Sequence, residues 1–108
     1  MITGLLITPN GAPEVVSFEE GYRPIQQLVE GSFEYVGLFD DADVIVHEEG
    51  KINGSAPNRF LLHDGKLVDI LFGNILLTDS DRDGNTVSLS KDKLEKYRRI
   101  FSQRAIII

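Results

Sequence analysis

One short segment of the chain brings three carboxylates close together. Asp79, Asp81 and Asp83 alternate and Gly84 follows, which is how a calcium-binding EF-hand loop begins. Such a loop also needs a bidentate acid at its twelfth position, where this chain has Ser90. Aspartate is also favoured in tight turns, because its side chain accepts hydrogen bonds from nearby backbone amides. We therefore predict an acidic hairpin loop, with weak calcium binding as the alternative.

A second polar cluster surrounds Asn58 and Arg59. Asn58 offers a hydrogen-bond donor and an acceptor, and Arg59 offers a rigid fork that suits a carboxylate or a phosphate. Lys51 comes a few residues earlier, and His63 a few residues later. These four side chains are the candidate binding site for a small ligand of the nucleotide or carboxylate type. The alternative is structural: Arg59 holds its own loop by binding carbonyl groups or an aspartate.

Histidine occurs beside acidic residues at two places, but neither forms a catalytic or zinc motif. His47 precedes Glu48 and His63 precedes Asp64, without the His-x-x-x-His spacing of a helical zinc site. The serine in Gly54–Ala56 lacks the flanking residues of a nucleophile elbow. The chain has no cysteine and no glycine-rich phosphate loop. We therefore expect a protein without enzymatic activity and without a cofactor.

Charge is distributed unevenly along the chain, whose formal net charge is −6. Residues 1–90 hold 15 acidic and 5 basic side chains, whereas residues 91–104 hold 2 acidic and 6 basic ones. An acidic body repels phosphate, so direct nucleic-acid binding is not expected. Carboxylates along a strand edge could instead imitate phosphates and occupy the nucleic-acid groove of a host enzyme. The alternative is a solvated surface that keeps a small domain dispersed. The acidic residues concerned are Glu14, Glu19, Glu20, Glu30, Glu34, Asp40, Asp41 and Asp43.

The elements that must position these residues begin with a predicted hairpin. Two apolar runs, Ile2–Ile7 and Val15–Phe18, flank the Asn-Gly pair at residues 10–11, which tolerates positive φ. A short helix follows. Pro24 suits its first position, and Gly31 suits the left-handed position after its end.

The middle of the chain is predicted to be rich in strands. Residues 32–39 and 44–48 form two of them, joined by an aspartate-rich turn. Residues 59–73 are either two short strands or a short helix followed by a strand. A strand over residues 74–79 is expected to pair with residues 86–89 across the acidic loop.

The C-terminal part is predicted to be a helix followed by an apolar tail. Ser90 is a good N-cap, and apolar residues recur after it at helical spacing. The apolar stripe consists of Leu94, Tyr97, Ile100 and Phe101. Four apolar residues at a chain end, Ala105–Ile108, are expected to dock, either as a strand on the chain's own sheet or against a partner.

These elements predict an α+β fold, a mainly antiparallel sheet with two or three helices packed on one face. A length of 108 residues suits a single globular domain over residues 1–108. The first residues have no basic region of the kind that begins a signal peptide, and no segment reaches the roughly 20 apolar residues of a membrane span. Because the chain also lacks cysteine, we expect a cytoplasmic protein.

The order of several short motifs resembles a known family. The helix end at Glu30, the Glu-Glu-Gly-Lys turn after His47, the Pro57–Arg59 segment and the glycine before an apolar strand at Gly73 occur in the family's order. This family consists of small uncharacterised proteins found in phages, conjugative elements and Gram-positive bacteria. Glu30 replaces the first glycine of the family's Val-Gly-Gly helix end, and the resemblance extends to Tyr97. It implies an accessory protein of a mobile element, some of whose genomic neighbours are anti-restriction proteins, and no catalytic residue is carried over.

The functional expectation combines this resemblance with the charge. The leading hypothesis is a non-enzymatic phage or mobile-element accessory protein that binds a host protein and inhibits a defence system through its acidic surface. The alternative is the small-ligand binder built on Lys51, Asn58, Arg59 and His63. Mutual docking of the Ala105–Ile108 tails also predicts a homodimer.

Overall fold

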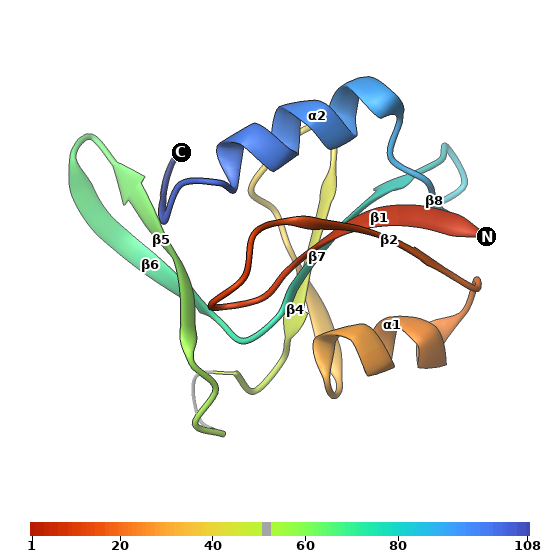
Figure 1. Ribbon diagram of the computed structural model, residues 1–108, viewed down its shortest axis with the longest axis horizontal. Coiled ribbons are helices and arrows are strands. Elements are labelled where there is room, and N and C mark those ends of the chain that lie inside the picture. The colour runs from red at the N-terminus through yellow and green to blue at the C-terminus, as the bar shows by residue number, and fades with distance from the viewer. Residues whose placement is uncertain (51–52) are drawn as a thin grey trace.

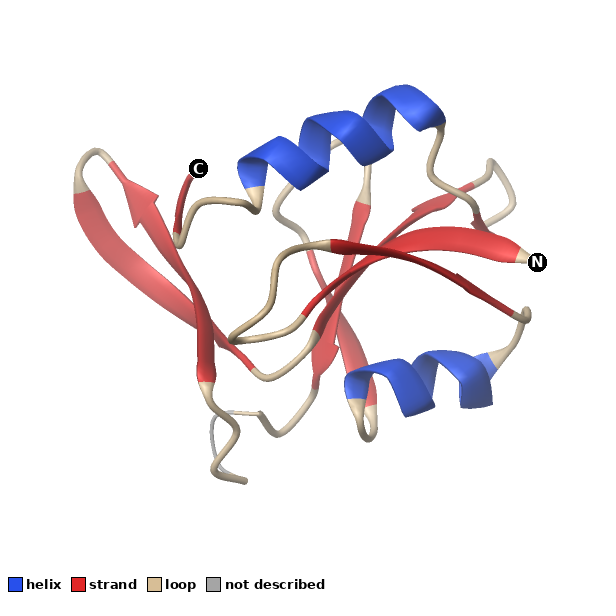
Figure 2. Ribbon diagram, in the orientation of Figure 1, coloured by secondary structure: helices blue, strands red, loops and turns tan. Residues whose placement is uncertain are grey.

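The computed structural model describes residues 1–50 and 53–108, and these form two helices and nine strands (Figure 1; Figure 2). The helices are α1 (Tyr22–Val29) and α2 (Lys91–Ile100). The strands are β1 (Ile2–Ile7), β2 (Glu14–Phe18), β3 (Phe33–Val36), β4 (Asp43–His47), β5 (Pro57–His63), β6 (Lys66–Phe72), β7 (Ile75–Ser80), β8 (Thr86–Val87) and β9 (Ala105–Ile107). The predicted α+β class is confirmed.

The main sheet is antiparallel and has the strand order β2-β1-β7-β4-β3, with β8 paired to β7 outside this path. Its centre is β7, in which Leu77 lies opposite Leu5 of β1 and Leu76 lies opposite Ile45 of β4. The predicted hairpins β1–β2 and β7–β8 are both present. Strand β3 is one outer edge of this sheet, and β2 is the other.

A second, smaller sheet has the order β6-β5-β9. Strands β5 and β6 form a hairpin around Asp64 and Gly65, whose φ values of 51° and 76° fit a two-residue turn of type I′. Of the two alternatives for this segment, the pair of strands is therefore correct. Strand β9 runs parallel to β5, with Ile106 opposite Leu61. The apolar tail thus docks on the chain's own sheet.

Both faces of the main sheet are buried, each by a different helix. One face packs against α2 and the small sheet, with Leu77 of β7 meeting Tyr97 and Phe101 of α2. The other face packs against α1, where Leu76 of β7 meets Ile25. Figure 1 shows α1 and α2 on opposite sides of the sheet. The expectation that the helices share one face is therefore wrong, because neighbouring residues on a strand point to opposite faces and here both faces are apolar.

Helix α1 ends differently from the prediction. Glu30 adopts the left-handed conformation, with φ of 67° and ψ of 34°, and the backbone N–H of Gly31 donates to the carbonyl of Gln26 at 2.9 Å. This is a Schellman end, in which the first residue beyond the helix is left-handed. The prediction assigned that position to Gly31. Pro24 is also the third residue of the helix and not the first.

Helix α2 agrees with its predicted start and apolar stripe. The Ser90 hydroxyl accepts a hydrogen bond from the backbone N–H of Lys93 at 3.2 Å, as an N-cap does. Tyr97 and Phe101 are fully buried, and Leu94 and Ile100 pack against the same core. The helix thereby covers one end of the main sheet.

The turn between β1 and β2 does not use the mechanism expected of its Asn-Gly pair. Among the described residues, those with positive φ include Asp64 and Gly65 but neither residue 10 nor residue 11. The connection is longer than a two-residue turn, and it is closed by a bond from Gly11 N–H to the carbonyl of Thr8 at 3.4 Å. The predicted hairpin is therefore present, but the Asn-Gly pair at residues 10–11 does not form the positive-φ turn on which the prediction was based.

Candidate functional site

Asn58 and Arg59, at the start of β5, are buried and bonded to the protein itself. They are 0% and 3% exposed. Arg59 Nε and Nη2 donate to the carbonyl of Phe101 at 3.1 and 2.5 Å, and Nη1 donates to Asn58 Oδ1 at 2.6 Å. Asn58 Nδ2 donates to the carbonyls of Ile7 and Gly73 at 2.8 and 2.6 Å. Arg59 therefore binds carbonyl groups of its own chain, as the structural alternative predicts. Ligand binding by Asn58 and Arg59 stays a prediction.

The Arg59 guanidinium lies at the C-terminal end of α2. Phe101 is the C-cap of this helix, where carbonyl groups lack helical donors and carry the negative end of the helix dipole. Burial lowers the pKa of Arg59, and the charge of Arg104 adds to this effect. Carbonyl and amide oxygens therefore surround this buried cation. A ligand could use the guanidinium only if these bonds were first broken.

The structure does not place His63 beside Asn58 and Arg59, and it does not describe Lys51. His63 lies at the far end of β5, four residues and about 13 Å along an extended strand from Arg59. Its Nδ1 is 2.7 Å from the carbonyl oxygen of Ile108, and its Nε2 is 3.6 Å from the carboxylate of Asp64. Lys51 lies outside the described residues. The structure therefore groups Asn58 with Arg59 and separates His63 from them.

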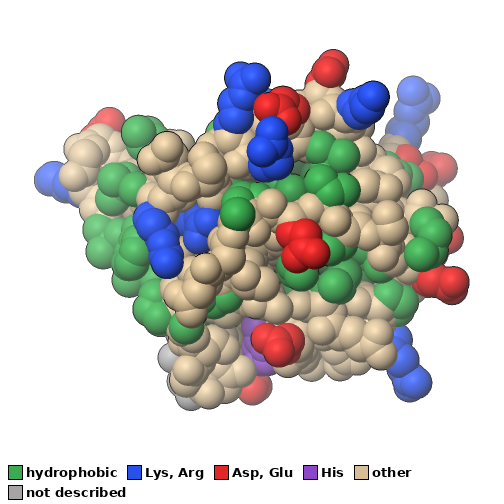
Figure 3. Space-filling view, in the orientation of Figure 1, with side chains coloured by type: hydrophobic (Ala, Val, Ile, Leu, Met, Phe, Trp, Pro, Cys, Tyr) green, Lys and Arg blue, Asp and Glu red, His purple; other side chains and the backbone are tan. Residues whose placement is uncertain are grey.

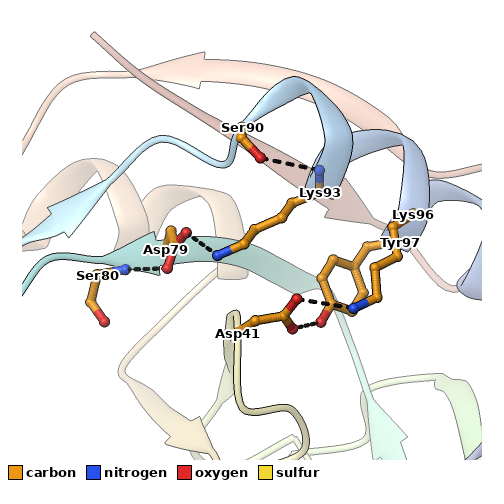
Figure 4. Close-up of polar contacts among 7 residues, drawn as sticks. All are labelled: Asp41, Asp79, Ser80, Ser90, Lys93, Lys96 and Tyr97. Atoms are coloured by element: carbon orange, nitrogen blue, oxygen red, sulfur yellow. Dashed lines mark hydrogen bonds and ion pairs between the residues drawn. The ribbon is translucent and has the colours of Figure 1, made fainter.

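Two of the three aspartates of the acidic loop, Asp79 and Asp81, have separate side-chain partners. Asp79 Oδ2 lies 2.6 Å from Lys93 Nζ, and Figure 4 shows this pair joining β7 to α2. Asp81 Oδ1 accepts from the backbone N–H groups of Asp83 and Asn85, each at 2.9 Å. Bonds from Asn85 are the main reason that the pKa of Asp81 is lowered. The predicted acidic hairpin loop is present.

No metal-binding cluster of three or more histidine or acidic side chains is found in residues 1–50 and 53–108. Calcium binding by Asp79, Asp81 and Asp83 stays a prediction, because it would require Asp79 to leave Lys93 and Asp81 to release backbone amides of its own turn. The loop as it stands is held by these bonds.

A second polar contact ties α2 to the loop before β4. The Tyr97 hydroxyl donates to Asp41 Oδ1, and Lys96 Nζ lies 2.9 Å from Asp41 Oδ2 (Figure 4). The bond from Tyr97, followed by that from Lys96, lowers the pKa of Asp41. Burial, with the Asp41 bond second, raises the pKa of Tyr97. Together with the Asp79 pair, this contact fixes α2 to the sheet.

His47, at the end of β4, is held by one backbone group and one side chain of the residues that follow it. Its Nδ1 accepts a hydrogen bond from the N–H of Glu49 at 2.9 Å, and its Nε2 lies 3.2 Å from Asn53 Nδ2. A Cβ atom on Gly31 would overlap the imidazole ring, so glycine is needed there for this close approach. The helix end at Glu30 and the position of His47 are therefore coupled.

A groove of about 390 Å³ opens beside His47, between one face of the main sheet and the small sheet. Strand β3 contributes Glu34 and Val36, β4 and the next loop contribute Val46, His47 and Glu48, and β6 contributes Asp69–Phe72. Glu34 lies opposite Val46 in the β3–β4 pairing, so both side chains point to the same face. The groove is thus an open end of the core, with an apolar floor and carboxylates at its rim.

Apolar surface continues from this groove along β6. Leu67 and Val68 are 56% and 53% exposed, in a hollow of about 290 Å³ that shares Asp69, Ile70 and Phe72 with the groove. Figure 3 shows hydrophobic side chains gathered over the β5–β6 hairpin and basic side chains along α2. The small sheet therefore presents accessible apolar surface on this side of the molecule.

Sequence reasoning identified individual residues of this groove without assembling them. The sequence places Glu34 among the carboxylates that could lie on a strand edge, and His47 with Glu48 lacks the spacing of a metal motif. Val36 and Asp69 carried no functional signal, because the groove exists only where two sheets meet. The sequence shows that residues 67–72 are largely apolar, and only the structure shows that Leu67 and Val68 are exposed.

Neither helix in the described part of the chain is long and apolar enough to cross a membrane. A protein-family model with the description Domain of unknown function (DUF3846) matches residues 2–102. No curated protein and no solved structure matches the chain.

Proposed function

Because the chain belongs to the DUF3846 family, a domain of unknown function, we propose its role from the site itself: it is a non-enzymatic protein that binds another protein through the groove between β3–β4 and β6. The observation that carries this proposal is the combination of an apolar floor with an acidic rim. Protein interfaces commonly bury an apolar centre inside a polar border. The groove offers Val36 and Val46 as the floor and Glu34 and Glu48 at the border.

The charge of the molecule supports a basic partner. The net charge is −6, and a basic partner would be steered towards such a surface before contact. We propose a host protein as this partner and the cytoplasm as the compartment, as the resemblance to proteins of phages and conjugative elements implies. A defence protein with a nucleic-acid groove is the specific case that the acidic surface favours.

The small-ligand alternative receives less support from the geometry. A nucleotide or carboxylate at Asn58 and Arg59 would have to compete with the carbonyl of Phe101 and with bonds inside the core. A thermal-shift screen of nucleotides, cyclic nucleotides and carboxylates tests it, because any specific ligand raises the melting temperature by mass action. Stabilisation that Arg59→Lys abolishes would restore this alternative.

A homodimer through Ala105–Ile108 stays a separate proposal. Ile106 is buried against the small sheet, whereas Ile107 is 82% exposed, so only the outward side chains of β9 are open to a second copy. Light scattering of the wild-type chain and of Ile107→Lys over a range of concentrations tests it. A monomer at all concentrations contradicts it.

Site-specific cross-linking tests the proposed function. A photoreactive phenylalanine derivative replaces Glu34, an exposed residue of edge strand β3 in the groove. The matched control replaces Glu14, an exposed glutamate on β2 at the opposite edge of the same sheet. In lysate of the host cell we expect a covalent partner from position 34 and none from position 14. Equal capture from both positions, or capture from neither, contradicts the proposal.

A further inference from the structure

We propose that the groove takes an extended segment of its partner, which pairs as an added strand with the free edge of β6 and carries alternating apolar and basic side chains. This inference rests on the proposed function and specifies the chemistry of the bound segment. Three features of the described residues carry it: the direction of the β6 backbone groups, the length of the open surface, and its charge.

The backbone groups of β6 at Ile70 point away from β5. Ile70 lies opposite Phe60, and the Phe60 N–H donates to the carbonyl of Arg104 at 2.9 Å, on the β9 side of β5. Phe60 and Ile70 are therefore a non-hydrogen-bonded pair, whose amides face outward from the hairpin. In agreement, the Ile70 N–H donates to the Oδ1 atom of Asp69 at 2.8 Å. A carboxylate oxygen thus occupies the place where a neighbouring strand would offer a carbonyl.

The open surface follows the length of β6. In the small sheet of the described residues β6 is an outer strand, and the groove and the adjoining hollow share Asp69, Ile70 and Phe72. Together they extend from Leu67 to Phe72, about 20 Å of strand. A compact ligand would fill one of the two hollows, whereas an extended segment of about six residues fits both. Strand addition at a free edge is a common mode of peptide recognition.

The side chains around β6 indicate what the segment carries. Val36, Val46 and Leu71 offer apolar contacts in the groove, and Glu34 and Glu48 bring carboxylates to it. Of the residues that the structure describes, no lysine or arginine lines either hollow. Side chains of an added strand alternate between two faces. Apolar residues at every second position would contact the floor, and the long basic side chains between them would extend from the open side of the groove towards the carboxylates at its rim.

Synthetic peptides test this inference on the full chain. The probe is the blocked hexapeptide Val-Arg-Val-Arg-Val-Arg, observed by two-dimensional amide NMR. We expect shifts confined to residues 66–72, 33–36 and 46–50, and weaker binding as salt rises. The acidic peptide Val-Glu-Val-Glu-Val-Glu and a copy of the probe that is N-methylated at every residue are expected to bind at least about tenfold more weakly, because the first is repelled and the second cannot pair.

Two matched variants locate the binding. Leu67→Lys places a positive charge on β6 and is expected to lower the affinity for the basic probe peptide at least about fivefold. Val15→Lys makes the same kind of change at a residue of similar exposure on β2, and is expected to leave affinity within about twofold. Equal affinity for the N-methylated peptide, or shifts centred outside β6, overturns the inference. Partner capture through position 34 would still stand in that case, because cross-linking does not depend on strand pairing.

Discussion

The guanidinium of Arg59 on β5 binds the carbonyl of Phe101 at the end of α2 through two of its donors, at 3.1 and 2.5 Å. This contact joins the small sheet to the helix that covers the main sheet. Since β6 is paired to β5, it also helps to hold β6 at the groove. A residue expected to bind a ligand therefore has a structural role that supports the proposed binding surface.

Replacing Arg59 should destabilise the fold. Arg59→Ala removes the donors that Arg59 gives to the Phe101 carbonyl and to Asn58 Oδ1, and we expect the free energy of unfolding to fall by about 3 kcal/mol. Arg59→Lys should also destabilise, because one ammonium group cannot reproduce the planar fork. Urea denaturation measures both changes. Arg82→Ala, on the exposed acidic loop, is the control and should change stability by less than about 0.5 kcal/mol. Wild-type stability of Arg59→Ala would contradict the structural role.

The left-handed conformation of Glu30 at the end of helix α1 suggests a substitution that should stabilise the fold. Glu30 occupies a left-handed conformation that glycine adopts without steric cost, so Glu30→Gly should raise the free energy of unfolding by about 0.5–1 kcal/mol. Gly31→Ala should lower it, because the added Cβ would overlap the His47 ring. Thermal denaturation of the two variants distinguishes these positions. A loss of stability in Glu30→Gly would show that the glutamate side chain contributes a contact of its own.

Protonation of Asp41 should reduce the stability of the fold at low pH. The Tyr97 hydroxyl and then Lys96 lower its pKa in the folded state, so its contribution is present above the unfolded pKa of about 3.9 and is lost as pH falls through the folded value. In Tyr97→Phe the pKa of the Asp41 carboxyl should rise towards its ordinary value. The loss of folding stability caused by protonation of Asp41 at low pH should then be smaller. NMR titration of the Asp41 carboxyl carbon measures this. An unchanged pKa in Tyr97→Phe would assign the effect to Lys96.

The acidic loop should not respond specifically to calcium. Asp79 pairs with Lys93, and Asp81 accepts hydrogen bonds from its own turn. A site with a Kd of about 1 mM would raise the melting temperature by several degrees at about 10 mM calcium. We expect the same melting curve in calcium and in magnesium at equal ionic strength. A calcium-specific rise that Asp79→Asn removes would establish the site.

Local signals in the sequence predicted most of the elements but not their assembly. Ser90 caps α2 and Asp64 turns the β5–β6 hairpin because each acts through atoms within a few residues. The covering of both sheet faces could have been predicted, since Leu76 and Leu77 are neighbours that must point to opposite sides and are both apolar. The prediction of one helical layer overlooked that requirement.

The proposed binding surface could be predicted from the sequence to a smaller extent than the fold. The sequence allows Arg59 to be either a ligand residue or a residue that binds carbonyl groups of its own chain, because its role depends on where the end of α2 lies. The groove exists because β6 lies near β3 in the folded chain. No pattern in the sequence indicates that these two strands are close together. Charge alone indicated an acidic exterior, and only the packing of the two sheets shows where carboxylates meet an apolar floor.

Amide hydrogen exchange of the full chain, free and bound to the partner captured through position 34, tests the central claim most directly. In the free protein the Ile70 N–H is bonded only to a side chain of its own exposed strand in the described structure, so its exchange should be fast. Binding along β6 predicts slower exchange at residues 66–72 and 46–50, with β2 unchanged. Protection on β2 or α2, with β6 exchanging as in the free protein, would contradict the account.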